Sequence, residues 1–368
     1  MILLHITQLF FHGQLLNIPD RYAVIMPGEL VDDIVVVSDQ KEGGQIYNKG
    51  NYGYPISGGG MNLDLLEATY LLESKRLEIF RNGQRLTFEE MFDHSSSIHE
   101  DFDIRYIVYR DIRERGFVVK NETGDFHLSV FPRGKLISNS RPEFLVLAVS
   151  ERTAFSMNDF SDAIDMTVKK GKKLLYSVVD EEGDLTYYVV SKKEMKGKVT
   201  FDDKVKANGR LIRDRVFIFN SKECDNVHKN GFFGKTISGM LQLSLIESCY
   251  LMEKGMLSVT SSSGNVTLED LKKMGDSVQN EFKIRLDTFS DLRDKGLLVK
   301  TGFKYGTHFR VYERSPDECH ARFLVHSVIG KNKMTWPEIS RTVRLAHGVK
   351  KEILFKASDY IEFKRFRP

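Results

Sequence analysis

The 368-residue sequence has few cysteines and almost no net charge. Its three cysteines, Cys224, Cys249 and Cys319, are far apart and support neither a disulfide framework nor a CxxC metal site. Basic residues number 54 and acidic residues 51, so the net charge of +3 does not by itself indicate a nucleic-acid-binding protein. The low cysteine content is typical of a reducing compartment, and we expect a cytoplasmic protein.

The sequence also lacks a long apolar run. The most apolar stretch, MILLHITQLFF at residues 1–11, is interrupted by polar residues and is too short to span a bilayer. It also lacks the basic region and the small-residue cleavage site of an export signal. Hydrophobic residues make up 41% and charged residues 29% of the chain, a globular rather than a disordered or fibrous composition. We therefore expect a folded chain without a membrane partner, long enough for two domains.

The chain contains an internal repeat. Residues 63–79, LDLLEATYLLESKRLEI, align with residues 243–259, LSLIESCYLMEKGMLSV, at an offset of 180. The same offset aligns YRDIRERGFVVK at 109–120 with FSDLRDKGLLVK at 289–300. Because chance similarity would not keep one register over two separate blocks, the sequence indicates a duplication.

The repeat divides the chain into a first copy, residues 1–198, and a second copy, residues 199–368. Residue spacing in the second copy predicts helices first and strands later, with one more helix after a capping box at Thr335-Trp-Pro-Glu338. The fold class is therefore α+β: two tandem copies, each with an N-terminal helical and β part followed by a mixed sheet and a packed helix. The expected segments are helices over 238–255, 277–295 and the residues after 335, and strands over 297–300, 307–312, 321–328 and 353–357.

Three separated blocks of the second copy carry a family resemblance. They are the strand GFKYGTHFRVY, the segment HARFLVH and the helix end RLAHGVKK, in that order. On these motifs the sequence resembles the archaeal tRNA-splicing endonuclease family, in its homodimeric type with duplicated halves. The resemblance covers both copies, and it implies an endoribonuclease that excises introns from precursor tRNA.

The resemblance implies a metal-independent site made of Tyr312, His320 and Lys351. In such a site the tyrosine is the general base for the RNA 2′-hydroxyl, the histidine is the general acid for the departing 5′-oxygen, and the lysine stabilises the crowded phosphorane. This lyase-type transesterification leaves 2′,3′-cyclic phosphate and 5′-hydroxyl ends. Taken singly, each residue is ordinarily structural; the order of the three motifs favours function. An unperturbed phenol is a poor base at neutral pH, and we expect cations such as Lys351 to lower the pKa of Tyr312.

The first copy lacks this set. Tyr312 aligns with Phe131 and His320 with Arg141, while the lysine is kept. Without the hydroxyl and the imidazole the first copy cannot run the same acid–base chemistry. We therefore expect it to be a non-catalytic structural copy.

An acidic loop distinguishes the first copy in another place. Two strand-like runs, LLYSVV and LTYYVV, are joined by a segment that contains Asp180, Glu181, Glu182 and Asp184. Composition alone favours a solvated hairpin. In the family that the chain resembles, such a loop inserts into a basic cleft of another subunit, which implies a homodimer. The strand before this loop and the strand at 353–356 are further candidates for pairing between subunits.

Positive charge gathers at the C-terminal end. Residues 331–368 hold ten basic and four acidic residues, while the rest of the chain is net negative. Such a patch attracts phosphate. The resemblance implies two arginines that stack on a bulged base: Arg344 matches the first, and either Arg365 or Arg367 matches the second. Asp165 stands at the position of Arg344 in the first copy.

Two other functions remain open. The chain could be a non-catalytic RNA-binding or assembly subunit of a splicing endonuclease complex, although the intact catalytic triplet argues against this. A DNA nuclease of similar architecture would need clustered acidic metal ligands, and none stands near Lys351. The histidines show no metal-binding spacing. We therefore expect precursor tRNA with a bulge-helix-bulge structure as the partner, no DNA, no metal and no cofactor.

Overall fold

The computed structural model describes residues 26–135, 137–202 and 204–368, so the apolar stretch at 1–11 lies outside the described residues. The chain forms two compact units, one that ends at Phe102 and one that spans Asp103–Pro368. Among the described residues, no helix combines the length and the apolar character that a membrane span requires.

The first unit is an N-terminal α/β part with a six-stranded sheet in the order β3-β4-β2-β1-β5-β6. Its inner strands are short and alternate between buried and less buried residues, which is the pattern of a sheet with one covered face. The elements are β1 Met26–Val31, β2 Ile34–Val37, α1 Gln40–Gly50, β3 Tyr54–Pro55, β4 Met61–Asp64, α2 Leu65–Glu73, β5 Leu77–Arg81, β6 Gln84–Arg85 and α3 Phe88–Ile98.

The second copy repeats this sheet in the order β15-β16-β14-β13-β17-β18. The expected helix over 238–255 is wrong in its first part. Gly239 turns the chain at a φ of 83°, and residues up to Leu243 form a strand, because Ser244 and Glu247 form a capping box that begins the helix at Leu245. The elements are β13 Ala207–Ile212, β14 Arg215–Ile218, α6 Ser221–Gly231, β15 Lys235–Ile237, β16 Met240–Leu243, α7 Leu245–Glu253, β17 Leu257–Ser261, β18 Gly264–Val266 and α8 Leu268–Val278.

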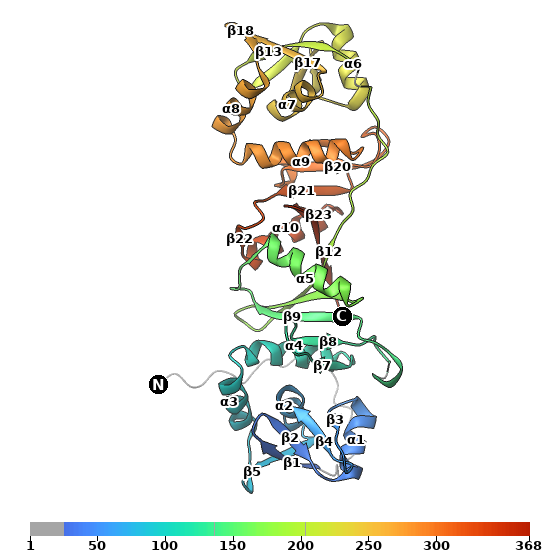
Figure 1. Cartoon of the computed structure of the whole chain (residues 1–368), viewed down its shortest axis with the longest axis vertical. Helices are drawn as coiled ribbons and strands as arrows, with labels where there is room; N and C mark the ends of the chain where they lie inside the picture. The colour runs from blue at the N-terminus through green and yellow to red at the C-terminus, as the bar shows by residue number, and fades with distance from the viewer. Residues whose placement is uncertain (1–25, 136, 203) are drawn as a thin grey trace. The chain divides into compact units, whose positions relative to one another are not determined.

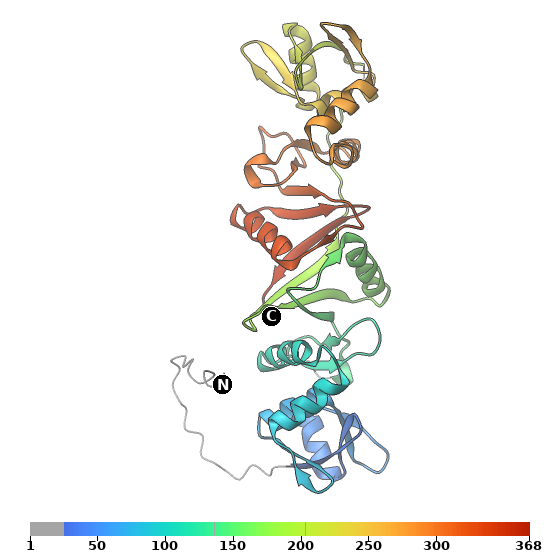
Figure 2. The same ribbon diagram turned by 90° about the vertical axis from the view of Figure 1, so that its left-hand side faces the viewer.

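The C-terminal parts of the two copies share one ten-stranded sheet, seen in Figures 1 and 2, with the order β19-β20-β21-β23-β24-β12-β11-β9-β8-β7. The order is palindromic because both copies contribute the same five strands. The C-terminal part of the first copy comprises α4 Phe102–Glu114, β7 Val119–Asn121, β8 Leu128–Val130, a 3₁₀ turn at Ile137–Asn139, β9 Phe144–Ser150, β10 Phe155–Ser156, α5 Met157–Lys169, β11 Lys173–Val179 and β12 Leu185–Lys192. Of these strands, β10 is not part of the ten-stranded sheet; it pairs with residues 333–334 of the second copy in a separate two-stranded sheet.

From the second copy come α9 Phe282–Asp294, β19 Leu298–Thr301, a 3₁₀ turn at Phe303–Tyr305, β20 Phe309–Tyr312, β21 Phe323–Ser327, β22 Lys333–Met334, α10 Trp336–Gly348, β23 Glu352–Lys356 and β24 Tyr360–Phe366. The expected helix over 277–295 begins five residues late, since Glu281 has a positive φ of 58° and α9 starts after it. The capping box at Thr335 and the strands expected over 297–300, 307–312, 321–328 and 353–357 are confirmed.

The two copies meet where β12 pairs with β24 in antiparallel register, from Tyr187 opposite Phe366 to Lys192 opposite Ile361. Helices α5 and α10 lie on the same face, where Phe160 packs edge-on against Trp336 with ring centroids 5.7 Å apart. The proposed subunit pairing by β11 and by β23 is therefore wrong: each of these strands already has a neighbour on both edges within the chain.

Candidate active site

Tyr312 is the last residue of β20 and pairs with Leu298 of β19. Its side chain is only 7% exposed and packs in a small cluster with Leu298 and Ala321. Alternation along β20 sends Phe309 and Val311 into the large core and leaves Tyr312 on the other face. The strand therefore fixes the phenol by packing rather than by a cap or a loop.

Burial raises the pKa of Tyr312 above its ordinary value, and the guanidinium of Arg310 opposes this rise. Arg310 lies with its central carbon 5.8 Å from the centroid of the Tyr312 ring. The expectation that Lys351 is the cation that lowers the pKa of Tyr312 is therefore replaced: Arg310 has this effect. Arg310 and Tyr312 are two residues apart on one strand, which places them on the same face, and this period-2 spacing is the signal that could have found Arg310.

Lys351 is positioned by the end of α10. The helix ends in a Schellman motif, in which Lys350 has a left-handed φ of 54° and the backbone NH of Lys351 donates to the carbonyl of Ala346 at 3.0 Å. The next residue, Glu352, starts β23 and donates its backbone NH to Arg322. The Lys351 ammonium then donates to the carbonyl of Ala321 at 2.6 Å.

His320 lies in the connection between β20 and β21, directly before Ala321. A turn closed by hydrogen bonds from the backbone NH groups of Glu318 and Cys319 to Ser315 leads into it. The imidazole is exposed, and it makes no hydrogen bond with another residue in the described part of the chain. Its ring nitrogens are therefore available to a bound substrate.

Ala321 is the point where the three predicted catalytic residues converge. It follows His320 in sequence, belongs to the cluster that holds Tyr312, and accepts the Lys351 hydrogen bond. Tyr312, His320 and Lys351 are thus connected through one backbone position, and their side chains supply two groups that can transfer protons and one positive charge.

An ion-pair network supports the strands at this position. The guanidinium of Arg322 donates to Glu313 at 3.0 Å and to Glu352 at 2.8 Å, and Lys193 reaches Glu352 from the first copy at 2.8 Å. Burial alone would raise the pKa of Glu352, but the hydrogen bonds from Lys193 and Arg322 outweigh it and hold the pKa below its usual value. These bonds connect the residue after β20, the residue before β21 and the start of β23, which flank Tyr312, Ala321 and Lys351.

Tyr305 is a neighbour of the site that the sequence did not point to. Its ring centroid lies 5.7 Å from the Lys351 ammonium, within the range of a cation–π contact. The residue is on the turn between β19 and β20, so no spacing in the sequence connects it with Lys351.

Two of the three predicted RNA-binding arginines line the same pocket. Arg344 is on α10, and it lines a polar pocket together with Arg365 of β24. Arg367, the alternative partner in the prediction, is not among the residues that line this pocket, and neither are the three predicted catalytic residues. Asp180 and Asp184 of the acidic loop complete the same pocket, together with Asp111, Arg115, Gly183, Leu185, Thr186, Tyr188 and Ser340.

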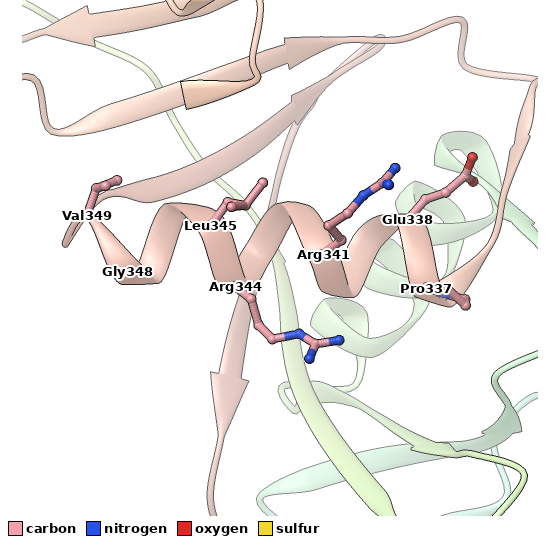
Figure 3. A pocket seen from close by; sticks show the side chains of 7 residues that line it. All are labelled: Pro337, Glu338, Arg341, Arg344, Leu345, Gly348 and Val349. Atoms are coloured by element: carbon pink, nitrogen blue, oxygen red, sulfur yellow. The ribbon is translucent and has the colours of Figure 1, made fainter. Parts of the chain in front are cut away.

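The outer surface of α10 forms a second, shallow hollow, shown in Figure 3. Arg344 points from one side of the helix, and Arg341 and Leu345 point from the other. Leu345 is 56% exposed, so apolar surface stands beside two guanidinium groups. The lining residues are Pro337, Glu338, Arg341, Arg344, Leu345, Gly348 and Val349.

The acidic loop is a tight hairpin turn between β11 and β12. The carboxylate of Asp180 accepts the backbone NH groups of Glu182 and Asp184, so it shapes the turn. Glu181 forms an ion pair with Arg152 of its own chain. Glu182 is exposed and has no ion-pair partner among the residues that the structure describes. The four acidic residues therefore differ in their availability to a partner.

The first copy places the residues aligned with Tyr312, His320 and Lys351 at similar positions of its fold. Phe131 is 6% exposed, as Tyr312 is 7% exposed, and Arg141 is an exposed residue before β9. Lys172 follows a helix end of the same type, with its backbone NH on the carbonyl of Thr167 at 3.1 Å. In the described part of the chain, no three or more His, Cys, Asp or Glu residues are grouped to hold a metal ion.

Comparison with known proteins identifies a family of RNA-processing nucleases. The description "tRNA intron endonuclease, catalytic C-terminal domain" matches residues 102–187 and 282–361, and "tRNA intron endonuclease, N-terminal domain" matches residues 26–92 and 207–272. The chain belongs to the tRNA intron endonuclease family, with both of its domains duplicated.

Archaeal relatives match over almost the whole chain. A tRNA-splicing endonuclease of Methanococcoides burtonii is 35% identical over 93% of this chain and all of its own length. The Methanosarcina barkeri tRNA-splicing endonuclease is 34% identical over 87% of this chain and 92% of its own length. That of Halobacterium salinarum is 31% identical over 91% of this chain and 95% of its own length.

Proposed function

We propose that the protein is an endoribonuclease that excises introns from precursor tRNA at bulge-helix-bulge structures, without a metal ion. The convergence of Tyr312, His320 and Lys351 at Ala321 is the observation that carries the proposal. Family membership and the named relatives support the tRNA substrate.

In the proposed reaction, Tyr312 takes the proton of the RNA 2′-hydroxyl at the cleavage site. The 2′-oxygen bonds to the adjacent phosphorus, and the bond from phosphorus to the 5′-oxygen breaks. His320 gives a proton to that departing oxygen, and the products are a 2′,3′-cyclic phosphate and a 5′-hydroxyl. Lys351 stabilises the additional negative charge on the phosphorane oxygens.

The exposure of His320 and the burial of Tyr312 fit these roles. A general acid must reach the leaving group, and an exposed imidazole can do so. A packed phenol keeps a fixed position and excludes water from its surroundings. Because burial raises the pKa of Tyr312, the base acts through a small phenolate fraction at neutral pH, and the Arg310 guanidinium increases that fraction.

Homodimerisation is part of the proposal. Each chain has one catalytic set and one acidic loop, and the β12–β24 pairing that joins the two copies lies within one chain. The acidic loop, through Glu182, supports a contact with a second chain. We also propose that Arg344 and Arg365, which share a pocket wall, are the arginine pair that binds the RNA.

Cleavage of a precursor tRNA transcript in EDTA, with analysis of the product ends, tests the proposed function. Wild-type protein should give cyclic phosphate and 5′-hydroxyl ends, and His320→Ala should lose cleavage by several orders of magnitude. His99→Ala is the matched control, because His99 is an exposed histidine in the other compact unit. A metal requirement, different product ends or full activity of His320→Ala would refute the mechanism. RNA binding without cleavage by the wild type would favour the alternative of a binding subunit.

A further inference from the structure

The segments that hold the catalytic residues in the second copy have counterparts of very different charge in the first. In the second copy, residues 312–322 and 348–352 contain four basic and four acidic residues. The corresponding residues 131–143 and 169–173 of the first copy contain seven basic residues and one acidic residue. The copy that lacks the catalytic tyrosine and histidine is therefore strongly basic at the corresponding place.

The fold brings these two basic segments together. Residues 131–135 leave β8 and residues 137–143 lead into β9, and residues 169–173 connect the end of α5 to the start of β11, which pairs with β9. The backbone NH of Lys173 donates to the carbonyl of Glu143 at 3.0 Å, and the NH of Glu143 donates to Val130 at 2.8 Å. Both segments thus lie at the end of the sheet where β9 and β11 begin (Figure 1).

Most of these cations are free to bind a ligand. Arg133, Arg141 and Lys169 are exposed, and none of them forms an ion pair with a residue in the described ranges. Lys173 is the exception, since it pairs with Glu143 at 2.8 Å. The C-terminal end of α5 favours nearby positive charge, which accounts for Lys169 and Lys170 at the helix end. This effect does not account for Arg133 and Arg141, which belong to the loop before β9.

We propose that this basic surface, defined by Arg133, Arg141 and Lys169, binds phosphate groups of the precursor tRNA at a distance from the cleaved bond. The inference rests on the proposed function, because an RNA substrate is what makes separate, exposed cations useful. The corresponding segments of the second copy surround one reacting phosphate, and their basic and acidic residues are equal in number. The first copy carries no catalytic tyrosine or histidine at this place, so its surface can serve to hold the RNA backbone.

Binding measurements on a triple variant test this surface. The variant is Arg133→Gln, Arg141→Gln, Lys169→Gln, and the matched control is Lys222→Gln, Lys235→Gln, Lys273→Gln, which removes three exposed lysines from the N-terminal part of the second copy. Both sets are made in a His320→Ala background, and the Kd for a precursor tRNA transcript is measured as a function of salt.

The triple variant should weaken binding at least tenfold at about 0.15 M salt. The plot of log affinity against log salt concentration should become less steep, its slope decreasing in magnitude by about two to three, since each lost phosphate contact removes about one. With His320 restored, cleavage by saturating enzyme should stay within about twofold of the wild type, because bound RNA still reaches the catalytic residues. The control should change the Kd by less than about twofold, as expected for cations outside the surface.

Two results would overturn the proposal. One is an unchanged Kd and salt slope. The other is a loss of dimer in the absence of RNA, which would show that the surface binds the acidic loop of a second chain. If the triple variant is less stable, single Arg133→Gln and Arg141→Gln variants should each lower the salt slope by about one. Because binding is measured without catalysis, this test gives a result even if the wild type does not cleave.

Discussion

The ammonium group of Lys351 donates a 2.6 Å hydrogen bond to the carbonyl of Ala321, the residue that follows His320. This contact joins the end of α10 to the start of β21, so one bond sets the lysine and the histidine relative to each other. An ammonium group has three protons, and this bond uses one of them. Two protons remain for the oxygens of a phosphate.

Replacing Lys351 should therefore impair chemistry more than binding. We expect Lys351→Met to slow single-turnover cleavage by roughly 100- to 1,000-fold, the usual effect of removing a group that stabilises transition-state charge. RNA affinity should change by less than about fivefold, because one contact is lost among many. Lys273→Met, at an exposed lysine of α8, is the control. Equal losses in binding and in rate would show that Lys351 only holds the RNA.

Arg310 should control the ionisation of Tyr312. Its guanidinium opposes the rise that burial causes in the pKa of Tyr312, so Arg310→Gln should raise that pKa further. A smaller phenolate fraction at neutral pH should slow cleavage roughly three- to tenfold. Single-turnover rates across pH measure the effect. The basic limb of the pH–rate profile, which reports the pKa of Tyr312, should move to higher pH.

Arg310→Lys keeps the charge and should restore most of the rate. Tyr312→Phe should lose cleavage but fold normally, since the first copy buries Phe131 at the same place. An unshifted basic limb in Arg310→Gln would contradict the role given to the arginine.

Substitutions at the ends of α10 and α5, directly before Lys351 and Lys172, should have opposite effects on stability. Lys350 has a φ of 54° and Gly171 a φ of 66°, so the second copy places a side chain where the first copy has glycine. The left-handed conformation costs a non-glycine residue about 1–2 kcal/mol, a cost that glycine does not have. Glycine in turn loses more conformational entropy on folding, which costs about 0.5–1 kcal/mol. Lys350→Gly should thus stabilise the chain by roughly 0.5–1 kcal/mol, and Gly171→Lys should destabilise it by a similar amount.

Chemical unfolding of both variants and the wild type provides the measurement. A Cβ at Gly171 would have no other atom within 4 Å, so the substitution tests backbone conformation without a steric clash. If Lys350→Gly and Gly171→Lys both raised or both lowered the free energy of unfolding, the left-handed backbone would not determine the effect.

Repetition and capping could be predicted from the sequence because they depend on local residue types. The duplicated fold, the helix start after the N-cap Thr335 and the end of α9 before Gly296 follow from such signals. Helix 238–255 was predicted too long because apolar residues of β16 continue into α7 without a change that periodicity detects. Pairing between strands far apart in sequence, such as β12 with β24, has no local signal.

The sequence motifs predict the three candidate catalytic residues, but they do not predict which other residues surround them. The convergence on Ala321 and the proximity of Tyr305 to Lys351 depend on which strands pair, so spacing could not provide them. Charge counting placed a basic region at the C-terminus, but the structure shows that Arg344 and Arg365 share a pocket with Asp180 and Asp184. Net charge over a segment does not reveal such a local arrangement of opposite charges.

The acidic loop should contribute to assembly through Glu182. Asp180 shapes the turn and Glu181 pairs with Arg152, so reversing all four acidic residues would mix loop structure with assembly. Glu182→Lys alone should weaken the dimer measurably, and sedimentation at several concentrations detects it. Glu194→Lys, at an exposed glutamate after β12, is the matched control. A dimer of unchanged affinity together with unchanged cleavage would remove the role of Glu182.

His308 should make the chain less stable in mild acid. Burial, the stacked ring of His326 with its centroid 4.2 Å away and the charge of Arg285 lower the pKa of His308 to about 3. Its Nδ1 accepts the backbone NH of Ser327 at 3.0 Å, which fixes the neutral ring. The unfolded chain takes up a proton near pH 6.5 and the folded chain does not, so stability is complete above pH 6.5 and falls as the pH decreases toward 3.

The loss amounts to at most about 1.4 kcal/mol per pH unit for this group. In His308→Asn the amide oxygen can accept the Ser327 NH but does not titrate, so the urea midpoint should shift less between pH 7 and pH 5 than in the wild type. His99→Asn, at an exposed histidine, should behave as the wild type does. An identical pH shift in His308→Asn and the wild type would show that the buried imidazole does not determine the acid sensitivity.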